Sequence, residues 1–277
     1  MANIFLRYPG NKAKCLTFSY DDGNVADVRL VEMFNKHNVK GTFNLNAGSI
    51  PEDETGWRLS KKDVEHLYDG HEVATHGFEH PILFAIDLPT MTNQLLQDRL
   101  GLEKLFGRVI KGYAYPFGKP AGLDDELYTS MRACGIQYGR TVNSTLKFDL
   151  PRDWYNWHPT CHHKHEKLME LADNFLEYDA KAQPHNQSPY LFYVWGHSFE
   201  FDNMDNWEVM ENFLEKIAGK EDVWYATNGE IYDYVTAFRS LSFSADQSMV
   251  YNPSHHKIFF ATKEKDYVVN PGETIKL

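Results

Sequence analysis

Four residues in the first third of this chain have the types and the spacing of a metal-dependent hydrolytic site. Asp21 and Asp22 are adjacent, and His76 and His80 follow them with three residues between the two histidines. Two imidazoles and one carboxylate are a common ligand set for a hydrolytic metal, and they leave coordination positions for water and substrate. The second carboxylate is then free to act as a base. The grouping favours a hydrolase.

The candidate residues all follow runs that are predicted to be strands. In α/β sheets and barrels, functional sites lie at the carboxyl ends of the strands. We therefore expect these side chains, together with a later histidine, to meet at one edge of the sheet. The strand-like runs are 14–20 before Asp21 and Asp22, 71–75 before His76, 111–115 before the segment Tyr115–Gly118, and 190–196 before His197.

The same residues also have simpler interpretations. A spacing of four places His76 and His80 on one side of a helical turn, but a solvated histidine pair has the same spacing. The sequence Asp21-Asp22-Gly23 also suits a turn followed by a helix N-cap. His197 has the alternative of a capping or core histidine. The metal-site hypothesis depends on the strand ends coming together.

Strand-like and helix-like segments alternate along most of the chain. Buried strands separated by helices predict an α/β fold with a parallel sheet, either open or closed into a barrel. The β-like segments after residue 240 predict a small β-rich extension, 241–277, behind a catalytic domain of residues 1–240. The predicted strands are 14–20, 40–46, 71–75, 111–115, 136–142, 190–196 and 223–226, and the predicted helices are 25–38, 61–68, 89–106, 124–134, 166–176, 207–217 and 229–240.

Composition restricts the partners. The net charge of −11 argues against nucleic acid or an anionic membrane surface. Three widely spaced cysteines predict neither a disulfide framework nor a cysteine–zinc site. The start of the chain has no signal-peptide pattern, and no run approaches the ~20 apolar residues of a membrane span. We expect a cytoplasmic protein, although a secreted chain trimmed of its leader has the same pattern. The sequence carries no signal for an oligomeric state.

The motifs, in this order, resemble those of the polysaccharide deacetylases, the NodB-homology carbohydrate esterases of family 4. The first family motif is of the Thr-Phe-Asp-Asp-Gly type, and this chain has Ser-Tyr inserted before the aspartate pair. The resemblance spans about Cys15 to Phe199. The matching segments are Thr17–Gly23, His76–His80 for His-Ser/Thr-x-x-His, Pro116–Gly118 for Pro-Tyr/Phe-Gly, Asp153–Trp157 for an Asp/Trp motif, and Leu191–His197 for a strand that ends in histidine.

This resemblance implies a deformed (β/α) barrel and a divalent metal, usually Zn²⁺, with Co²⁺, Ni²⁺ or Mn²⁺ as alternatives. We further expect substrate contacts from Tyr115, Trp157 and His162, and support of the catalytic acid by Asp153. The implied roles are metal ligation by Asp22, His76 and His80, general base by Asp21, general acid by His197, and oxyanion binding by the backbone N–H of Phe117.

Two departures from the family pattern indicate a divergent subgroup. The third family motif often carries an arginine two residues before its proline, where it pairs with the base, and this chain has Ala114. Asp21 is therefore expected to lack an arginine partner. Gly77 replaces the serine or threonine between the histidines, which removes a hydroxyl that would hold the loop.

The segment from Trp157 to His165 contains four histidines and a cysteine. Such a cluster could bind a second metal, but we favour a polar loop that covers the pocket. This loop includes His162, His163 and His165. Trp157 has two interpretations of equal weight, stacking on a sugar ring or filling the core.

Three functions are consistent with these residues. The first is metal-dependent removal of acetyl groups from an N-acetylated, or less favourably an O-acetylated, carbohydrate. The second is hydrolysis of a C–N bond in a small non-sugar amide or imide, which Ala114 and the missing signal peptide favour. The third is a non-catalytic carbohydrate-binding barrel, against which the complete ligand set argues.

Overall fold

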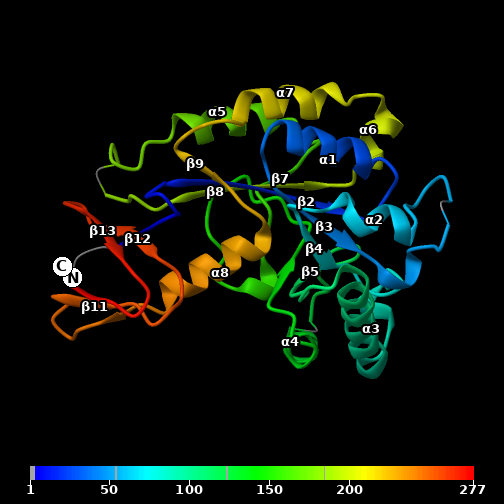
Figure 1. Ribbon diagram of the computed structural model, residues 1–277, viewed down its shortest axis with the longest axis horizontal. Coiled ribbons are helices and arrows are strands. Elements are labelled where there is room, and N and C mark those ends of the chain that lie inside the picture. Colours follow the sequence, from blue (N-terminus) through cyan, green and yellow to red (C-terminus); the bar gives the residue numbers. More distant parts are fainter. Residues whose placement is uncertain (1–3, 54, 123, 184) are drawn as a thin grey trace.

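The computed structural model describes residues 4–53, 55–122, 124–183 and 185–277. Its centre is a curled sheet in which neighbouring strands are parallel, with helices on its outer face (Figure 1). In spatial order the strands are β6 (Tyr138–Arg140), β5 (Gly112–Ala114), β4 (Glu72–Thr75), β3 (Gly41–Leu45), β2 (Lys14–Asp21), β8 (Tyr190–Gly196) and β7 (Cys161–His162), and β9 (Val223–Tyr225) pairs with the first residues of β2.

Side chains join the sheet across its interior. Arg140 ends β6, yet it hydrogen-bonds to Asp21 at the end of β2, which is four strands away along the sheet. The Arg140 guanidinium also lies 4.6 Å from the ring centre of Trp195 in β8. A backbone bridge joins Arg140 to Trp157. The strands therefore curl into a deformed barrel, and the predicted fold class is confirmed.

Alternation along β2 explains which residues face the site. Phe18 and Tyr20 point outward and pack on Phe34 of the first helix. Ser19 and Asp21 point inward, where the side-chain amide of Asn44 in β3 donates to both. Successive side chains of a strand point to opposite faces. Because Phe18 and Tyr20 occupy the positions that face the aromatic core outside the sheet, Asp21 faces the inside of the barrel.

Helices α1, α5 and α7 cover one face of the sheet, while α3 and α4 pack together beside β4 and β5 (Figure 1). The long helix α3 begins at an Asp87 N-cap and ends at Gly107, whose φ of 63° is left-handed. The helices are α1 (Asp27–Lys36), α2 (Lys61–Leu67), α3 (Leu88–Phe106), α4 (Asp124–Ala133), α5 (Leu168–Glu177), α6 (Phe199–Met204), α7 (Glu208–Ile217) and α8 (Asn228–Arg239), with 3₁₀ turns at η1 (Ala47–Ser49), η2 (Leu83–Ala85) and η3 (Trp154–Asn156).

The C-terminal segment forms two small antiparallel sheets that pack near α8 (Figure 1). One of them includes β1 (Phe5–Arg7), a strand that the sequence did not predict, which pairs with β12. The division into 1–240 and 241–277 stays a prediction. The other strands of these sheets are β10 (Ser242–Phe243), β11 (Met249–Tyr251), β12 (Ile258–Ala261), β13 (Asp266–Val269) and β14 (Thr274–Lys276).

Candidate active site

The carboxyl edge of the sheet brings Asp22, His76 and His80 together, as their positions after β2 and β4 predict. Oδ1 of Asp22 lies 3.9 Å from Nε2 of His76 and 3.7 Å from Nε2 of His80. His76 is buried, whereas the side chains of Asp22 and His80 are 13 % and 24 % exposed. The cluster is therefore anchored in the protein and open to solvent on one side.

The two histidines do not lie on a helical turn, so that expectation was wrong. They lie in a loop in which Gly77 and His80 have φ values of 77° and 56°. The loop turns the rings toward each other, with 4.8 Å between their centres. A Cβ on Gly77 would lie 2.5 Å from Cδ of Pro81. The glycine that replaces the family's serine or threonine is thus required by the backbone of this loop.

The cluster has the chemistry of a metal site. Nδ1 of His76 lies 2.8 Å from the carbonyl oxygen of Ala114, which accepts its proton and leaves the lone pair of Nε2 facing Asp22. A tetrahedral ion with bonds of about 2.1 Å separates its ligand atoms by roughly 3.5 Å, close to the distances found here. Two imidazoles and a carboxylate therefore fit a divalent ion. Its identity as Zn²⁺, Co²⁺, Ni²⁺ or Mn²⁺ stays a prediction.

Three residues of this edge have a left-handed backbone that non-glycine residues rarely adopt. They are Asp22, His80 and Phe117, with φ values of 83°, 56° and 58°. Strain of this kind persists where surrounding contacts impose it, often at functional sites. Arg58 provides such a contact, because its Nη1 donates to the Asp22 carbonyl over 2.6 Å. The folded barrel therefore holds Asp22 in an orientation that an isolated loop would not favour.

Asp21 is buried and has an arginine partner, which corrects the expectation drawn from Ala114. Nη2 of Arg140 hydrogen-bonds to both carboxylate oxygens of Asp21, and Nδ2 of Asn44 donates to Oδ1 over 2.8 Å. Burial raises the pKa of Asp21, but the charges of Arg140, His76 and His197 outweigh it and lower the pKa to about 2. Asp21 is therefore ionised at neutral pH.

Sequence reasoning did not find Arg140 because the arginine comes from a different strand than the family motif suggests. Its signal was present, since Arg140 interrupts a predicted buried strand at 136–142. A charged residue in such a strand needs a buried partner. Only the curl of the sheet shows that the partner is Asp21.

His197 follows β8 and faces the aspartate pair. Its Nε2 lies 3.9 Å from Oδ2 of Asp21 and 4.0 Å from Oδ2 of Asp22. Its Nδ1 lies 3.5 Å from Oε2 of Glu200, a residue of α6 that the sequence did not single out. Burial lowers the pKa of His197, but the Glu200 carboxylate beside Nδ1 and the nearby aspartates outweigh it and raise the pKa above its usual value. The imidazole is thus suited to carry a proton near neutral pH.

Glu200 is the centre of a second cluster, with His162 and His163. Its Oε2 lies 3.1 Å from Nε2 of His162 and 3.3 Å from Nε2 of His163. The ammonium of Lys164 lies 2.5 Å from Oε1. Nδ1 of His162 accepts the Lys164 backbone N–H over 3.1 Å, so a neutral His162 carries its proton on Nε2 and donates it to Glu200. Hydrogen bonds and a lysine already satisfy this carboxylate.

Three predicted substrate-contact or support residues lie elsewhere, and those expectations are corrected. Trp157 is 1 % exposed and packs on Tyr138 and Tyr193, so it fills the core. Tyr115 is equally buried, and its hydroxyl donates to the Tyr155 carbonyl. Asp153 accepts from the Tyr128 hydroxyl, whereas the carboxylate that faces His197 is Glu200.

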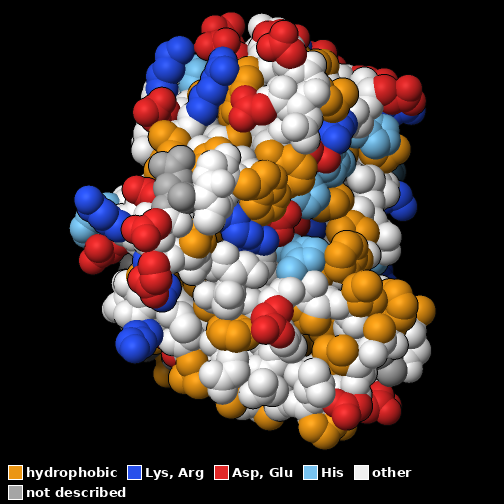
Figure 2. Space-filling model, turned by 90° about the vertical axis from the view of Figure 1, so that its right-hand side faces the viewer, with side chains coloured by type: hydrophobic (Ala, Val, Ile, Leu, Met, Phe, Trp, Pro, Cys, Tyr) orange, Lys and Arg blue, Asp and Glu red, His pale blue; other side chains and the backbone are white. Residues whose placement is uncertain are grey.

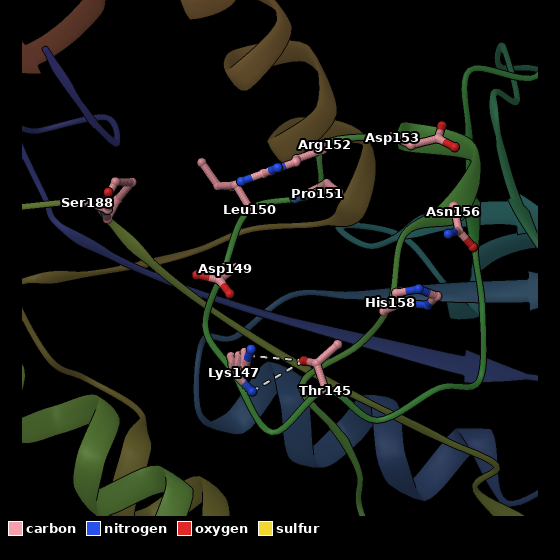
Figure 3. A pocket seen from close by; sticks show the side chains of 11 residues that line it. Thr145, Lys147, Asp149, Leu150, Pro151, Arg152, Asp153, Asn156, His158 and Ser188 are labelled. Carbon is pink, nitrogen blue, oxygen red and sulfur yellow. Dashed lines mark hydrogen bonds between the residues drawn. The ribbon is translucent and has the colours of Figure 1, made fainter. Parts of the chain in front are cut away.

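Asp153 lines a cavity of about 780 Å³ that the segment 145–158 encloses with Ser188 and Pro189 (Figure 3). Lys147, Asp149 and Arg152 are among the residues that line it, so the lining carries both positive and negative charges (Figure 3). None of the metal-cluster residues, nor His197, lines it. This cavity therefore does not extend the metal cluster.

Hydrophobic side chains flank the histidines on the open face of the molecule, where a hollow exposes charged groups (Figure 2). Phe117 is 67 % exposed and its ring lies 4.6 Å from that of His80. Trp57 is 44 % exposed, packs on Phe199, and carries the Arg58 guanidinium 4.8 Å from its ring centre. Exposed aromatic faces beside a polar centre suit a ligand with both apolar and polar faces.

Comparison with known proteins supports the motif-based resemblance. The pattern of the polysaccharide deacetylase family matches residues 9–139. Peptidoglycan-N-acetylglucosamine deacetylase PgdA of Listeria monocytogenes is 30% identical over 123 residues, which cover 40% of this chain and 25% of PgdA. A peptidoglycan-N-acetylglucosamine deacetylase of Bacillus cereus is 28% identical over 116 residues, which cover 40% of this chain and 38% of that protein. The chain thus matches well under half the length of these curated relatives.

Solved structures show the same fold. A polysaccharide deacetylase from Mycobacterium smegmatis superposes with a TM-score of 0.60 at 16% identity, over 86% of this chain and 96% of that one. A family 4 carbohydrate esterase from Streptomyces lividans, in complex with acetate, gives 0.50 at 11% identity, over 78% of this chain and 93% of that one. The predicted resemblance to the polysaccharide deacetylases is confirmed.

No helix within the described residues combines the length and apolar composition that crossing a bilayer requires.

Proposed function

We propose that this protein is a metal-dependent hydrolase that removes acetyl groups from an N-acetylated carbohydrate. The observation that carries the proposal is the meeting of three units in one hollow. These are the metal-type cluster around Asp22, the Asp21–Arg140 pair, and His197 backed by Glu200. Each supplies one requirement of amide hydrolysis, namely a cation site, a base and an acid.

Asp22, His76 and His80 would hold the ion, which when bound would polarise the acetyl carbonyl and acidify a water. Asp21 remains ionised and is fixed by Arg140 and Asn44, so it can accept a proton from the attacking water. The backbone N–H of Phe117 is the proposed donor to the developing oxyanion. His197 would give its Nε2 proton to the departing amine while Nδ1 faces Glu200.

The sugar substrate is supported by the walls of the hollow and by the relatives. Exposed Phe117 lies against His80, and exposed Trp57 packs on Phe199, whose ring lies 5.1 Å from that of His197. Aromatic surface near the polar groups suits a sugar ring. The Listeria and Bacillus relatives are named as deacetylases of N-acetylglucosamine in peptidoglycan. One of the two arguments for the small-amide alternative was a missing arginine, and Arg140 removes that argument.

Acetate release tests the proposal directly. N-acetylglucosamine oligomers and acetylated xylan would be incubated with protein loaded with zinc or cobalt. Asp21→Asn and His76→Ala should abolish release, whereas His66→Ala, at an exposed histidine on α2, should not change it. Full activity in either site variant would refute the mechanism. Turnover of small amides alone would reassign the substrate.

A further inference from the structure

The loop that carries His76 and His80 is held by contacts that no family motif supplies. Gly77 offers no hydroxyl to stabilise the loop, and His80 has a left-handed φ of 56°, which is strained for a residue with a side chain. Metal ligands must nevertheless be kept in place before the ion binds. The supporting contacts come from α3 and from the residue that follows β3.

Asp98 of α3 makes the most direct of these contacts. Its side chain is completely buried, and Oδ2 accepts the backbone N–H of His76 over 2.8 Å. Oδ1 accepts the backbone N–H of Ala47, in η1, over 2.6 Å. Within the described ranges, no lysine, arginine or histidine side chain pairs with Asp98. A buried carboxylate without a cation is costly, so its placement demands an explanation.

Two amide side chains hold the rest of the loop. Nδ2 of Asn46 donates to the carbonyls of His76 and Gly77 over 2.7 and 2.6 Å. Gln94, one helical turn before Asp98 on α3, accepts the Glu79 N–H over 2.9 Å and donates to the Glu79 carboxylate over 2.9 Å. The backbone is therefore held at His76, Gly77 and Glu79.

We propose that Asp98 is a positioning residue for the metal ligand His76, and that Asn46 and Gln94 complete a clamp that replaces the missing hydroxyl of the loop. The inference relies on the proposed metal site. Asp98 fixes the backbone of His76, and the Ala114 carbonyl fixes its ring through Nδ1. Together these two contacts orient Nε2 toward Asp22.

Metal affinity is the readout, because partners that orient metal ligands typically contribute 10–100-fold. Asp98→Asn keeps the shape but replaces one of the two acceptor oxygens with an NH₂ group that cannot accept a backbone N–H, so we expect zinc and cobalt to bind about 10-fold more weakly. The matched control is Glu72→Gln, at a carboxylate that accepts from Thr42, Tyr138 and Gly229 at the opposite edge of the sheet. It should change the affinity less than twofold.

The affinities would be measured by titration of metal-free protein without substrate, with cobalt absorption reporting ligand geometry. Equal affinities of wild type and Asp98→Asn, or an equal loss in Glu72→Gln, would overturn the proposal. If Asp98→Asn does not fold, Gln94→Met tests the same clamp, and a several-fold loss supports it whereas unchanged affinity refutes it. Failure of the proposed function would instead appear as absent acetate release from protein that binds metal normally.

Discussion

Two clusters at the carboxyl edge of the sheet each contain two histidines and one carboxylate, but their hydrogen bonds differ. Around Asp22, Oδ1 lies 3.7–3.9 Å from the two imidazole nitrogens, and the His76 ring donates its proton away from the centre to Ala114. Around Glu200, His162 donates its proton toward the centre, and Lys164 neutralises the carboxylate. The first cluster directs the lone pair of His76 at a cation site, whereas the Glu200 carboxylate already contacts His162 and Lys164.

This difference shows that residue types alone do not define a metal site. A histidine can ligate a metal only with a nitrogen that has no proton, and the partner of its other nitrogen decides which one that is. For His76 that partner is an acceptor, and for His162 it is a donor. The Glu200 cluster therefore serves the Asp22 cluster, because Glu200 faces the other nitrogen of His197.

The largest effect is expected on zinc affinity, when His80→Ala is compared with His162→Ala. Both histidines are partly exposed, and each belongs to one of the two clusters. Loss of a direct ligand should weaken zinc binding by at least about 100-fold, since even partners of ligands contribute 10–100-fold. His162→Ala should retain one equivalent of zinc. Isothermal titration on metal-free protein measures both. Loss of zinc from the His162 variant would contradict the claim that the Asp22 cluster, and not the Glu200 cluster, binds the metal.

A smaller effect is expected when Asp21 loses its partner in Arg140→Met. The variant leaves a buried carboxylate unpaired, which should lower the free energy of unfolding by about 3–5 kcal/mol. Deacetylation should fall by roughly 100-fold while zinc stays bound, because Asp21 is no longer oriented. Chemical denaturation and steady-state kinetics test this.

Arg239→Met, at an exposed arginine that donates to the Pro151 carbonyl, is the control and should leave activity unchanged.

The Asp21 pKa of about 2 also predicts the direction in which stability changes with pH. The ion pair's contribution to stability is complete above the unfolded pKa of about 4 and is lost as the pH falls toward 2. In Arg140→Met that dependence should disappear. An unchanged acid denaturation curve would contradict the account.

Glu200→Gln should lower kcat by about 10-fold and leave the zinc content unchanged. The Glu200 carboxylate, 3.5 Å from Nδ1, raises the pKa of His197. Activity that needs protonated His197 is lost as the pH rises through that pKa. Without the Glu200 charge, the basic limb of the pH–rate profile should move to lower pH. Loss of zinc from this variant would instead identify Glu200 as a ligand.

The smallest effect concerns Asp27, a buried carboxylate that accepts from the Tyr68 hydroxyl over 2.7 Å. Among the residues that the structure describes, no cationic side chain pairs with it. Burial raises its pKa to about 7. Between about pH 4 and 7 the unfolded chain is ionised here and the folded one is not, so stability should fall by about 1 kcal/mol per pH unit as the pH rises. Asp27→Asn should flatten this slope in denaturation curves. An identical slope in the variant would contradict the assigned pKa.

Much of the fold could be predicted because its signals are local. The apolar run before His197 and the periodic leucines of α3 gave their elements nearly residue by residue. The placement of Asp22, His76 and His80 followed from one rule, that parallel strands end at a common edge. Strand β1 was missed because three residues form it only by pairing with β12, more than 250 positions away.

Interactions across the barrel could not be predicted from local patterns. Arg140 meets Asp21 only because the sheet curls, and Glu200 faces His197 only because α6 begins directly after β8. The Asp/Trp motif suggested Asp153 and Trp157 instead, but the first faces Tyr128 and the second fills the core. The backbone angles of Gly77 and His80 likewise exclude the helical turn that a spacing of four suggests.

The most direct test is anomalous diffraction at the zinc edge from crystals of the zinc-loaded protein. The two-cluster account predicts one peak, bounded by Oδ1 of Asp22 and the Nε2 atoms of His76 and His80, and none beside Glu200. A peak among His162, His163 and Glu200, or the absence of one at Asp22, would contradict it.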